Sequence, residues 1–271
     1  MSGPILHGAK EGASPVAGDL GAPVAPGARR VKLTISYDGT AYSGWQRQSN
    51  APSVQACLEK ALWGLTGEPI ALTGASRTDA GVHALGQVAH FDTRAAIPEE
   101  KFCFAMNTRL PADIRVVDSS KAPPDFHARY GATGKTYRYQ IHNSPHASAL
   151  YRNQRAHIIP PLDIALMREA CLDILGEHDF RAFAASGGVA KNTVRDITRA
   201  DLSQDGPLIE LTVAGRSFLY NMVRILAGSL IYIGMGKLPP DALGKALRTG
   251  NRLDLGITAP AAGLTLMEVR Y

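Results

Sequence analysis

The chain has 271 residues, of which 45% are hydrophobic and 20% are charged, and its formal net charge is +5 at pH 7. This length and composition predict a folded protein of about two domains. They exclude a disordered chain, a fibrous chain and a mini-protein held together by disulfides. The excess of basic residues favours a surface that attracts polyanions, although so small a charge does not by itself identify a nucleic-acid partner.

The cysteines and the first residues give expectations about the environment of the protein. Cys57, Cys103 and Cys171 lie far apart and show no C-x-x-C spacing, which excludes a disulfide framework and most zinc sites. We therefore expect a reducing, cytoplasmic location and no metal. Residues 1–30 are rich in Gly, Ala and Pro and lack the basic and apolar segments of a secretory signal, so they are expected to form a flexible tail.

The hydrophobic pattern predicts six elements in the first half of the chain: a strand at 31–37, a helix at 54–65, strands at 70–73 and 87–91, a helix from 98 to about 111, and a strand at 114–117. The first strand alternates apolar and polar residues, whereas the first helix carries its apolar residues on one face and is followed by Gly67. The connection at 74–86 is unusually long for two neighbouring strands, and such loops are often functional.

The second half is expected to hold a strand at 136–141, a helix at 164–175, strands at 193–202 and 208–213, a helix at 218–233, an extra helix at 240–248 and a last strand near 264–269. Residues 218–235 are long enough to cross a membrane, but Asn221 and Arg224 interrupt the apolar run and favour a buried helix. We expect no membrane segment.

Without the extra helix, both halves follow the order strand, helix, strand, strand, helix, strand, which is typical of ferredoxin-like domains. We therefore expect an α+β fold of two ferredoxin-like (RRM-like) halves, at 31–122 and 133–271, joined by a proline-containing junction. Their antiparallel sheets would pack side by side around a central basic cleft.

The densest candidate site is the run Gly74-Ala75-Ser76-Arg77-Thr78-Asp79-Ala80-Gly81-Val82-His83-Ala84. It places a single acid between Arg77 and His83 on a loop with two glycines. A glycosidase would need a second carboxylate nearby, and the loop has none. From spacing alone, Asp79 could equally form an Asx-turn while Arg77 is solvated.

Two further residues stand out in the second half. Arg224 lies in an apolar helix, where a buried guanidinium needs a carboxylate such as Asp79, although its head could also extend to water. Strand alternation in Lys135-Thr136-Tyr137-Arg138-Tyr139 sends both tyrosines to one face, where packing in the core is the common role. Trp45 could stack on a nucleobase or close the edge of the core.

Motif-like runs occur at 44–46, 77–84, 87–91, 106–114, 126–129, 135–137, 178–180, 218–224 and 259–264. Together they closely resemble the TruA family of tRNA pseudouridine synthases, over residues 31–271. The most specific of these runs is Arg77-Thr78-Asp79-Ala80-Gly81-Val82-His83. Residues 1–30 and 184–192 lie outside the family pattern.

The resemblance implies a homodimer that isomerises uridine to pseudouridine at positions 38, 39 and 40 in the anticodon arm of tRNA, without cofactor or metal. It further implies that Asp79 is the nucleophile, that Arg224 pairs with Asp79, and that Tyr137 contacts the uracil and takes part in proton transfer. Arg77 would assist base flipping, and Leu264 would form a wall of the pocket. Gln46 and Arg47 are candidate substrate contacts. Candidate phosphate contacts, each of which could equally be a solvated surface charge, are Arg47, Lys191, Arg195 and Arg216.

Two other classes of function fit parts of the pattern. Paired ferredoxin-like sheets with basic edges can bind RNA without any chemistry, and a uridine-directed hydrolase would release free uracil. An acid facing a buried arginine argues against a pure binding module, whereas product analysis separates the hydrolase from the isomerase.

Overall fold

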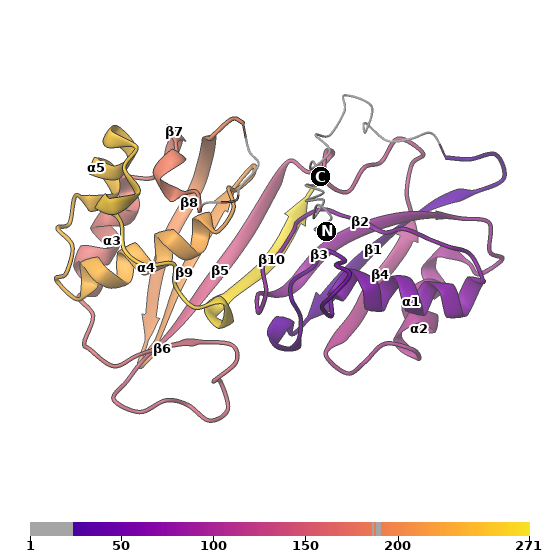
Figure 1. Cartoon of the computed structure of the whole chain (residues 1–271), viewed down its shortest axis with the longest axis horizontal. Coiled ribbons are helices and arrows are strands. Elements are labelled where there is room, and N and C mark those ends of the chain that lie inside the picture. The colour runs from indigo at the N-terminus through magenta and orange to yellow at the C-terminus, as the bar shows by residue number, and fades with distance from the viewer. Residues whose placement is uncertain (1–23, 186, 188–190) are drawn as a thin grey trace, which may run out of the picture.

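The computed structural model describes residues 24–185, 187 and 191–271, so the expected tail at 1–30 lies mostly outside the described residues. Within them, one ten-stranded sheet runs through both halves in the order β4-β1-β3-β10-β5-β9-β8-β7, with β2 beside β3 and β6 beside β5. The helices gather at the two ends of this sheet, α1 and α2 at one end and α3, α4 and α5 at the other (Figure 1). The fold is therefore a mixed α/β fold with a mostly antiparallel sheet.

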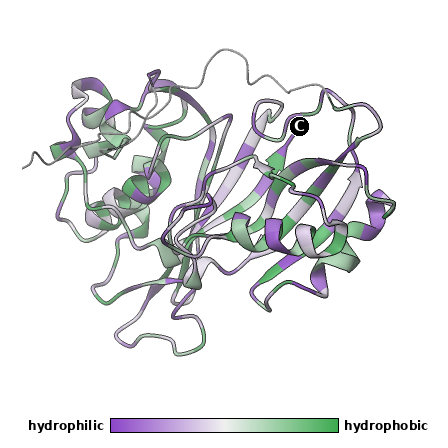
Figure 2. Ribbon diagram, turned by 45° about the vertical axis from the view of Figure 1, so that its right-hand side comes forward, coloured by the Kyte–Doolittle hydropathy of each residue, from purple (hydrophilic) through white to green (hydrophobic). Residues whose placement is uncertain are grey.

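The strands are β1 (Arg29–Tyr37), β2 (Thr73–Gly74), β3 (His83–Thr93), β4 (Ile114–Lys121), β5 (Gly134–Asn143), β6 (Ala156–Ile158), β7 (Gly176–Asp179), β8 (Val194–Asp205), β9 (Leu208–Gly215) and β10 (Leu264–Arg270). The α-helices are α1 (Val54–Thr66), α2 (Phe102–Asn107), α3 (Ile164–Leu172), α4 (Met222–Gly234) and α5 (Ala242–Thr249). Figure 2 shows hydrophobic and hydrophilic residues mixed along many of the strands and helices, as expected for elements that bury one face, whereas α4 is buried almost throughout.

The first strand and the first helix follow the sequence pattern. Burial alternates along β1, and α1 is capped at its start by Ser53, whose side chain accepts a hydrogen bond from the backbone of Ala56. The helix ends at Gly67, which adopts the left-handed conformation that glycine tolerates. The prediction of a helix at 54–65 is confirmed.

Other predictions of elements were less accurate. The expected strand at 70–73 is reduced to the two residues of β2, and the helix expected from 98 consists of a 3-10 turn at Glu99–Lys101 followed by the short α2. Strands β6 and β7 were missed, because at three and four residues they carry too little pattern to detect.

The expectation of two separate sheets was wrong. Strand β10 pairs in parallel with the first residues of β3, through Thr265 opposite His83 and Leu266 opposite Ala84. This pairing, which we call the seam, covers the edges that two separate sheets would leave open and joins the halves into one sheet. Since β2 pairs further along the same edge of β3, the chain between β2 and β3 lies at the seam.

The junction at 122–133 packs against the sheet. The backbone N–H of Ala128, a fully buried residue, donates to His90 Nδ1 of β3 at 3.2 Å, and the Ala128 carbonyl accepts from the Tyr271 hydroxyl at 2.6 Å. Burial, together with the positive charge of the nearby Arg30, lowers the pKa of His90 to about 4. His90 is therefore a neutral acceptor at physiological pH and stabilises the fold.

Helix α4 has 13 residues and was expected to begin at 218. It begins at Met222 because Asn221 adopts a left-handed backbone conformation with a φ of 59°. Across the part of the chain that the structure describes, no helix is long and apolar enough to cross a membrane.

The backbone of α4 lies against the segment before β10 at Gly228, where a Cβ would be 1.9 Å from the Ile257 carbonyl oxygen. We expect Gly228→Ala to lower the free energy of unfolding by about 3 kcal/mol, because neither backbone can move aside easily. Gly64→Ala in α1 is the matched control, since its Cβ meets only the flexible Arg109 side chain. Better helix propensity should make that control neutral or up to about 1 kcal/mol more stable. Urea denaturation of both variants measures the difference, and equal stabilities would contradict it.

Candidate active site

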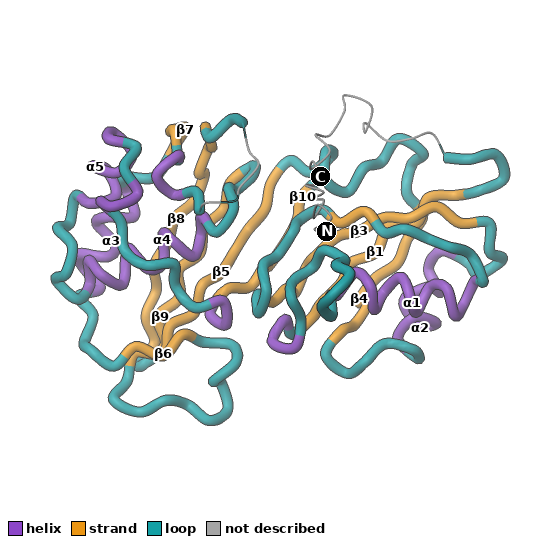
Figure 3. The backbone as a smooth tube through the Cα atoms, in the orientation of Figure 1, coloured by secondary structure: helices purple, strands orange, loops and turns teal. Residues whose placement is uncertain are grey.

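The loop that carries Asp79 connects β2 to β3 beside the seam. In Figure 3, loop segments run beside the central strands of the sheet, between the two groups of helices. The Asp79 loop is fixed at Thr78, whose carbonyl accepts from Trp45 N at 3.0 Å and whose hydroxyl is 2.7 Å from the Tyr37 hydroxyl. Trp45 is almost fully buried, which favours closure of the core over an exposed stacking role.

Gly44 allows the close approach of these two loops. Its φ is +94°, and a Cβ there would lie 2.5 Å from the Thr78 carbonyl oxygen. Any side chain at this position would push the Asp79 loop away from Trp45.

Asp79 faces Arg224 of helix α4, from the other half of the chain. Arg224 Nη1 lies 3.6 Å from Asp79 Oδ2, and each side chain has 18% of its surface exposed. The distance is longer than a normal hydrogen bond but close enough for a strong charge interaction. The structure thus brings together two residues that the sequence separates by more than half of the chain.

The guanidinium of Arg224 is held by two further acceptors. Its Nε donates to the carbonyl of Ala259 at 2.8 Å and its Nη1 donates to Asn221 Oδ1 at 2.9 Å. The Arg224 carbonyl also accepts from Ala259 N at 3.0 Å. The direction of the arginine is therefore fixed independently of Asp79.

The surroundings of Asp79 act on its pKa in opposite directions. Burial raises the pKa above its ordinary value and is the largest effect, while the charge and hydrogen-bonding capacity of Arg224 lower it. A carboxyl that is desolvated and opposed by one guanidinium is a typical arrangement for a functional group.

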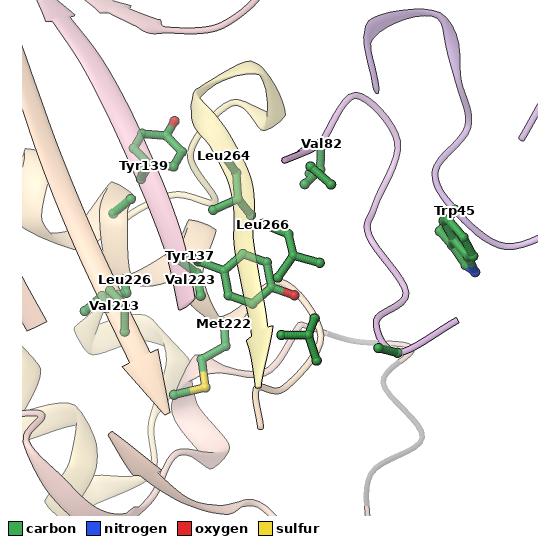
Figure 4. Close-up of a cluster of buried hydrophobic side chains, with 14 of the residues drawn as sticks. Trp45, Val82, Tyr137, Tyr139, Val213, Met222, Val223, Leu226, Leu264 and Leu266 are labelled. Carbon is green, nitrogen blue, oxygen red and sulfur yellow. The ribbon is translucent and has the colours of Figure 1, made fainter. Parts of the chain in front are cut away.

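Tyr137 approaches the same loop from strand β5. Its hydroxyl lies 2.9 Å from Ser76 Oγ, and its ring meets Phe218 edge to face at a centroid distance of 5.1 Å. Burial raises the pKa of Tyr137 to about 12, partly offset by the hydrogen bond with Ser76. In Figure 4 its oxygen points away from β5 toward the half of the molecule that contains Val82 and Trp45.

Apolar side chains surround these polar groups. Leu264 and Leu266 of β10 lie opposite Tyr139 and Tyr137 in the strand register, and both are buried. Figure 4 shows them beside the tyrosines, with Val82 on the other side. These side chains limit access of water to the space around Tyr137.

The other residues predicted from the sequence fall into two groups. Gln46 Nε2 donates to Gln55 Oε1 at 3.1 Å and Arg47 pairs with Glu59 at 2.9 Å, so both are engaged by helix α1. Arg77 is exposed two residues before Asp79 and forms no ion pair with the residues that the structure describes. Of Gln46, Arg47 and Arg77, therefore, Arg77 is the best placed to meet a charged ligand.

The three remaining basic candidates lie in the second half. Lys191 and Arg216 are exposed, whereas Arg195 Nη1 donates to the carbonyls of Asn192 and Val194. Residues 186 and 188–190, in the segment 184–192 that the sequence motifs left outside the family pattern, lie outside the described residues.

Two positioning residues were missed from the sequence. Gln87, with no exposed surface, accepts from Ser76 N at 3.2 Å and donates to the Ser76 carbonyl at 2.6 Å. A glutamine inside an apolar strand run was the available signal, because a buried amide needs partners. Asn221 stood out only as a polar interruption of an apolar run, and the left-handed backbone conformation behind its role appears only in the structure.

Among the described residues, no group of three or more His, Cys, Asp or Glu side chains is arranged to bind a metal ion. The site as described consists of a desolvated carboxylate, a fixed guanidinium and a buried phenol, on loops and strands of one α/β sheet. Groups of this kind are chemically suited to nucleophilic or acid–base catalysis on an organic substrate.

Comparison with known proteins identifies the class more closely. A family model described as tRNA pseudouridine synthase matches residues 33–131 and 170–271. A tRNA pseudouridine synthase A of Ruminiclostridium cellulolyticum is 51% identical over 244 residues, which cover 90% of this chain and 100% of the relative. A protein of the same name from Acetivibrio thermocellus is 50% identical over 243 residues, which cover 90% of this chain and 100% of the relative. The chain belongs to the tRNA pseudouridine synthase family, whose members are isomerases.

Among solved structures, a chain from "Crystal Structure of a Cbf5-Nop10-Gar1 Complex" aligns with a TM-score of 0.34 and 15% identity, over 87% of this chain and 48% of that chain. This overlap is too low to support any inference about fold or function.

Proposed function

We propose that this protein isomerises uridine to pseudouridine at positions 38, 39 and 40 in the anticodon arm of tRNA. The observation that carries the proposal is the 3.6 Å contact between Asp79 and Arg224, made by residues from the two halves of the chain beside Tyr137. The similarity to relatives named tRNA pseudouridine synthase A supports the same reaction and substrate.

In this proposal Asp79 is the nucleophile and Arg224 keeps it ionised and directed at the substrate. The bond between ribose C1′ and uracil N1 breaks, and the ribose is rejoined to uracil C5. The proton then lost from C5 is balanced by the proton that N1 takes up. Tyr137 contacts the uracil and takes part in that proton transfer, while Leu264 forms an apolar wall of the pocket. The balance of atoms requires no oxidant, reductant or cofactor.

The target uridine lies in a stacked or paired stem, so it must flip out of the helix before it can reach Asp79, at a cost of a few kcal/mol. Arg77 is exposed on the same loop and is proposed to stabilise the flipped state. Phosphate contacts are assigned to Lys191, Arg195 and Arg216, with Gln46 and Arg47 at the margin of the site.

We also infer that the chain consists of two ferredoxin-like halves, at 31–122 and 133–271, that flank a basic cleft and act as a cytoplasmic homodimer. The sheet order supports the two-half arrangement. The first half runs β4-β1-β3 with β2 on β3, and the second runs β10-β5-β9-β8, which is the same relative order.

The decisive experiment incubates the purified protein with unmodified tRNA, without added metal or nucleotide, and maps pseudouridine chemically along the transcript. Pseudouridine confined to positions 38, 39 and 40 is the expected result. Modification elsewhere would reject the site, release of free uracil would indicate a hydrolase, and binding without any product would indicate an RNA-binding module.

A further inference from the structure

Two contacts cross the seam and join the segment before Asp79 to strand β5. Lys135 Nζ donates to the Ala75 carbonyl at 2.7 Å, and Ser76 Oγ lies 2.9 Å from the Tyr137 hydroxyl. We call this pair of contacts the seam clasp. The reaction scheme above assigns no role to Ser76 or Lys135.

Because of the strand geometry, the two contacts of the seam clasp attach the loop to β5 at two neighbouring points. Lys135 and Tyr137 are two residues apart on β5, so their side chains leave the same face of the sheet. They meet two consecutive residues of the loop, Ala75 and Ser76. A pair of bonds at neighbouring points fixes both the position and the rotation of the loop, whereas a single bond would allow it to pivot.

The backbone of Ser76 is held separately from its side chain. Gln87 of β3 binds both the N–H and the carbonyl of Ser76, and it is completely buried. The hydroxyl of Ser76 is thereby directed at the Tyr137 hydroxyl, and each of these two residues has only 8% of its surface exposed. Asp79 follows three residues later, so one rigid segment connects the phenol to the carboxylate.

The environment of Lys135 also fits a positioning role. Burial, together with the positive charge of Arg129, lowers the pKa of Lys135 to about 8. A lysine used only for solubility would keep its ammonium group in water. Lys135 instead binds a main-chain carbonyl of the loop, which links its position to that of the backbone before Asp79.

We propose that Ser76 and Lys135 are positioning residues that hold the Tyr137 hydroxyl and the Asp79 carboxylate at a fixed separation during the reaction. This inference rests on the proposed function, in particular on the role of Tyr137. Ser76 directs the phenol oxygen, and Lys135 keeps Ser76 within reach of it. The hydrogen bond between Ser76 and Tyr137 also opposes the effect of burial on the pKa of Tyr137, so its loss would weaken proton transfer further.

A double-mutant cycle tests this inference on the full-length protein with unmodified tRNA. Ser76→Ala is expected to lower the single-turnover rate roughly three- to tenfold, the value of one hydrogen bond, with no change in the Kd for tRNA. In the Tyr137→Phe background the same substitution should cost nothing more, because the oxygen that Ser76 positions is already absent. Ser203→Ala on the exposed face of β8 is the matched control.

A second readout isolates the step at C5. Substrate with deuterium at uracil C5 should show a larger isotope effect with Ser76→Ala than with the unmodified protein, because misplacement of the phenol slows removal of that hydrogen. A purely structural role of Ser76 would instead lower thermal stability and leave the isotope effect unchanged.

Lys135 is tested with a conservative pair. Lys135→Met should slow turnover by a similar factor, and Lys135→Arg should recover most of the rate because a donor remains at the Ala75 carbonyl. Lys121→Met, at an exposed position of β4, controls for the loss of one positive charge.

The outcomes separate this inference from the function on which it rests. An equal loss from Ser76→Ala in both backgrounds, or a loss confined to tRNA binding, would overturn the positioning role alone. Full activity of Tyr137→Phe would overturn the role proposed for the phenol, and the positioning role with it. Failure of Asp79 substitutions to affect turnover would overturn the proposed mechanism itself.

Discussion

Replacement of Asp79 with asparagine is expected to abolish pseudouridine formation, with a loss of at least about 10⁴-fold in the single-turnover rate. Asparagine has nearly the same shape but cannot act as a nucleophile, and loss of a catalytic nucleophile generally has effects of this size. The loss should appear in the rate and not in the affinity for tRNA, since the exposed basic residues are unchanged.

The fold should tolerate this substitution. Burial raises the pKa of Asp79, so the ionised carboxylate is held against a desolvation cost, and its 3.6 Å contact with Arg224 is longer than a hydrogen bond. Arg224 also keeps its bonds to Ala259 and Asn221 when the acid is removed. We therefore expect a change in unfolding free energy within about 1 kcal/mol.

Three measurements decide the outcome: chemical mapping of pseudouridine, tRNA binding and urea denaturation. Asp205→Asn, at an exposed position at the end of β8, is the matched control and should retain full activity. Substantial turnover by Asp79→Asn in properly folded protein would exclude Asp79 as the nucleophile.

The sequence contains enough information to locate the acid but not its surroundings. The Asp79 loop stands out because an acid, an arginine and two glycines occur together in a connection too long for two neighbouring strands. Arg224 stands out because a charge interrupts an apolar helix. Each signal is local, and each allowed a solvated alternative until the structure placed the two side chains together.

The single sheet illustrates what a local pattern leaves undetermined. The seam depends on only two residue pairs between β10 and β3, which are separated by most of the chain. Alternation of apolar residues predicts a strand but carries no information about which distant strand covers its edge. Two sheets side by side and one continuous sheet are therefore equally compatible with the same sequence pattern.

Positioning residues were hard to predict for the same reason. Ser76 and Gln87 are small or neutral polar residues whose importance comes from partners on other elements. The start of α4 at Met222 was also missed, because apolar periodicity continues through Phe218 and Leu219 while the backbone at Asn221 turns left-handed. That turn allows the Asn221 side chain to accept from Arg224, so the deviation from the pattern contributes to the site.

Replacement of Arg224 with glutamine is expected to lower kcat/KM by about 10²–10³-fold, which is typical for loss of one charged donor in an active site. It should also move the acid limb of the pH profile of kcat/KM, which reports ionisation in the free enzyme. Burial raises the pKa of Asp79 and Arg224 lowers it. Without the guanidinium only the raising effect remains, so the acid limb should shift to higher pH.

Stability should change with pH in a related way. Because the pKa of Asp79 in the folded protein lies above its ordinary value, the native state binds this proton more tightly than the unfolded state does. The group therefore favours folding at low pH, and this contribution is lost as pH rises through the native pKa. In Arg224→Gln the unpaired carboxylate should make the protein less stable at neutral pH, and acidification should reduce the deficit.

Arg224→Lys separates the charge of Arg224 from its geometry. Lysine keeps a positive charge near Asp79 but cannot reproduce the bonds to both Ala259 and Asn221 that direct the guanidinium. Its acid limb should stay close to that of the unmodified protein, while its rate should remain well below it. Arg248→Gln, on the exposed surface of α5, is the control for loss of an arginine. An acid limb that is the same in the glutamine and lysine variants would show that Arg224 orients Asp79 without controlling its ionisation.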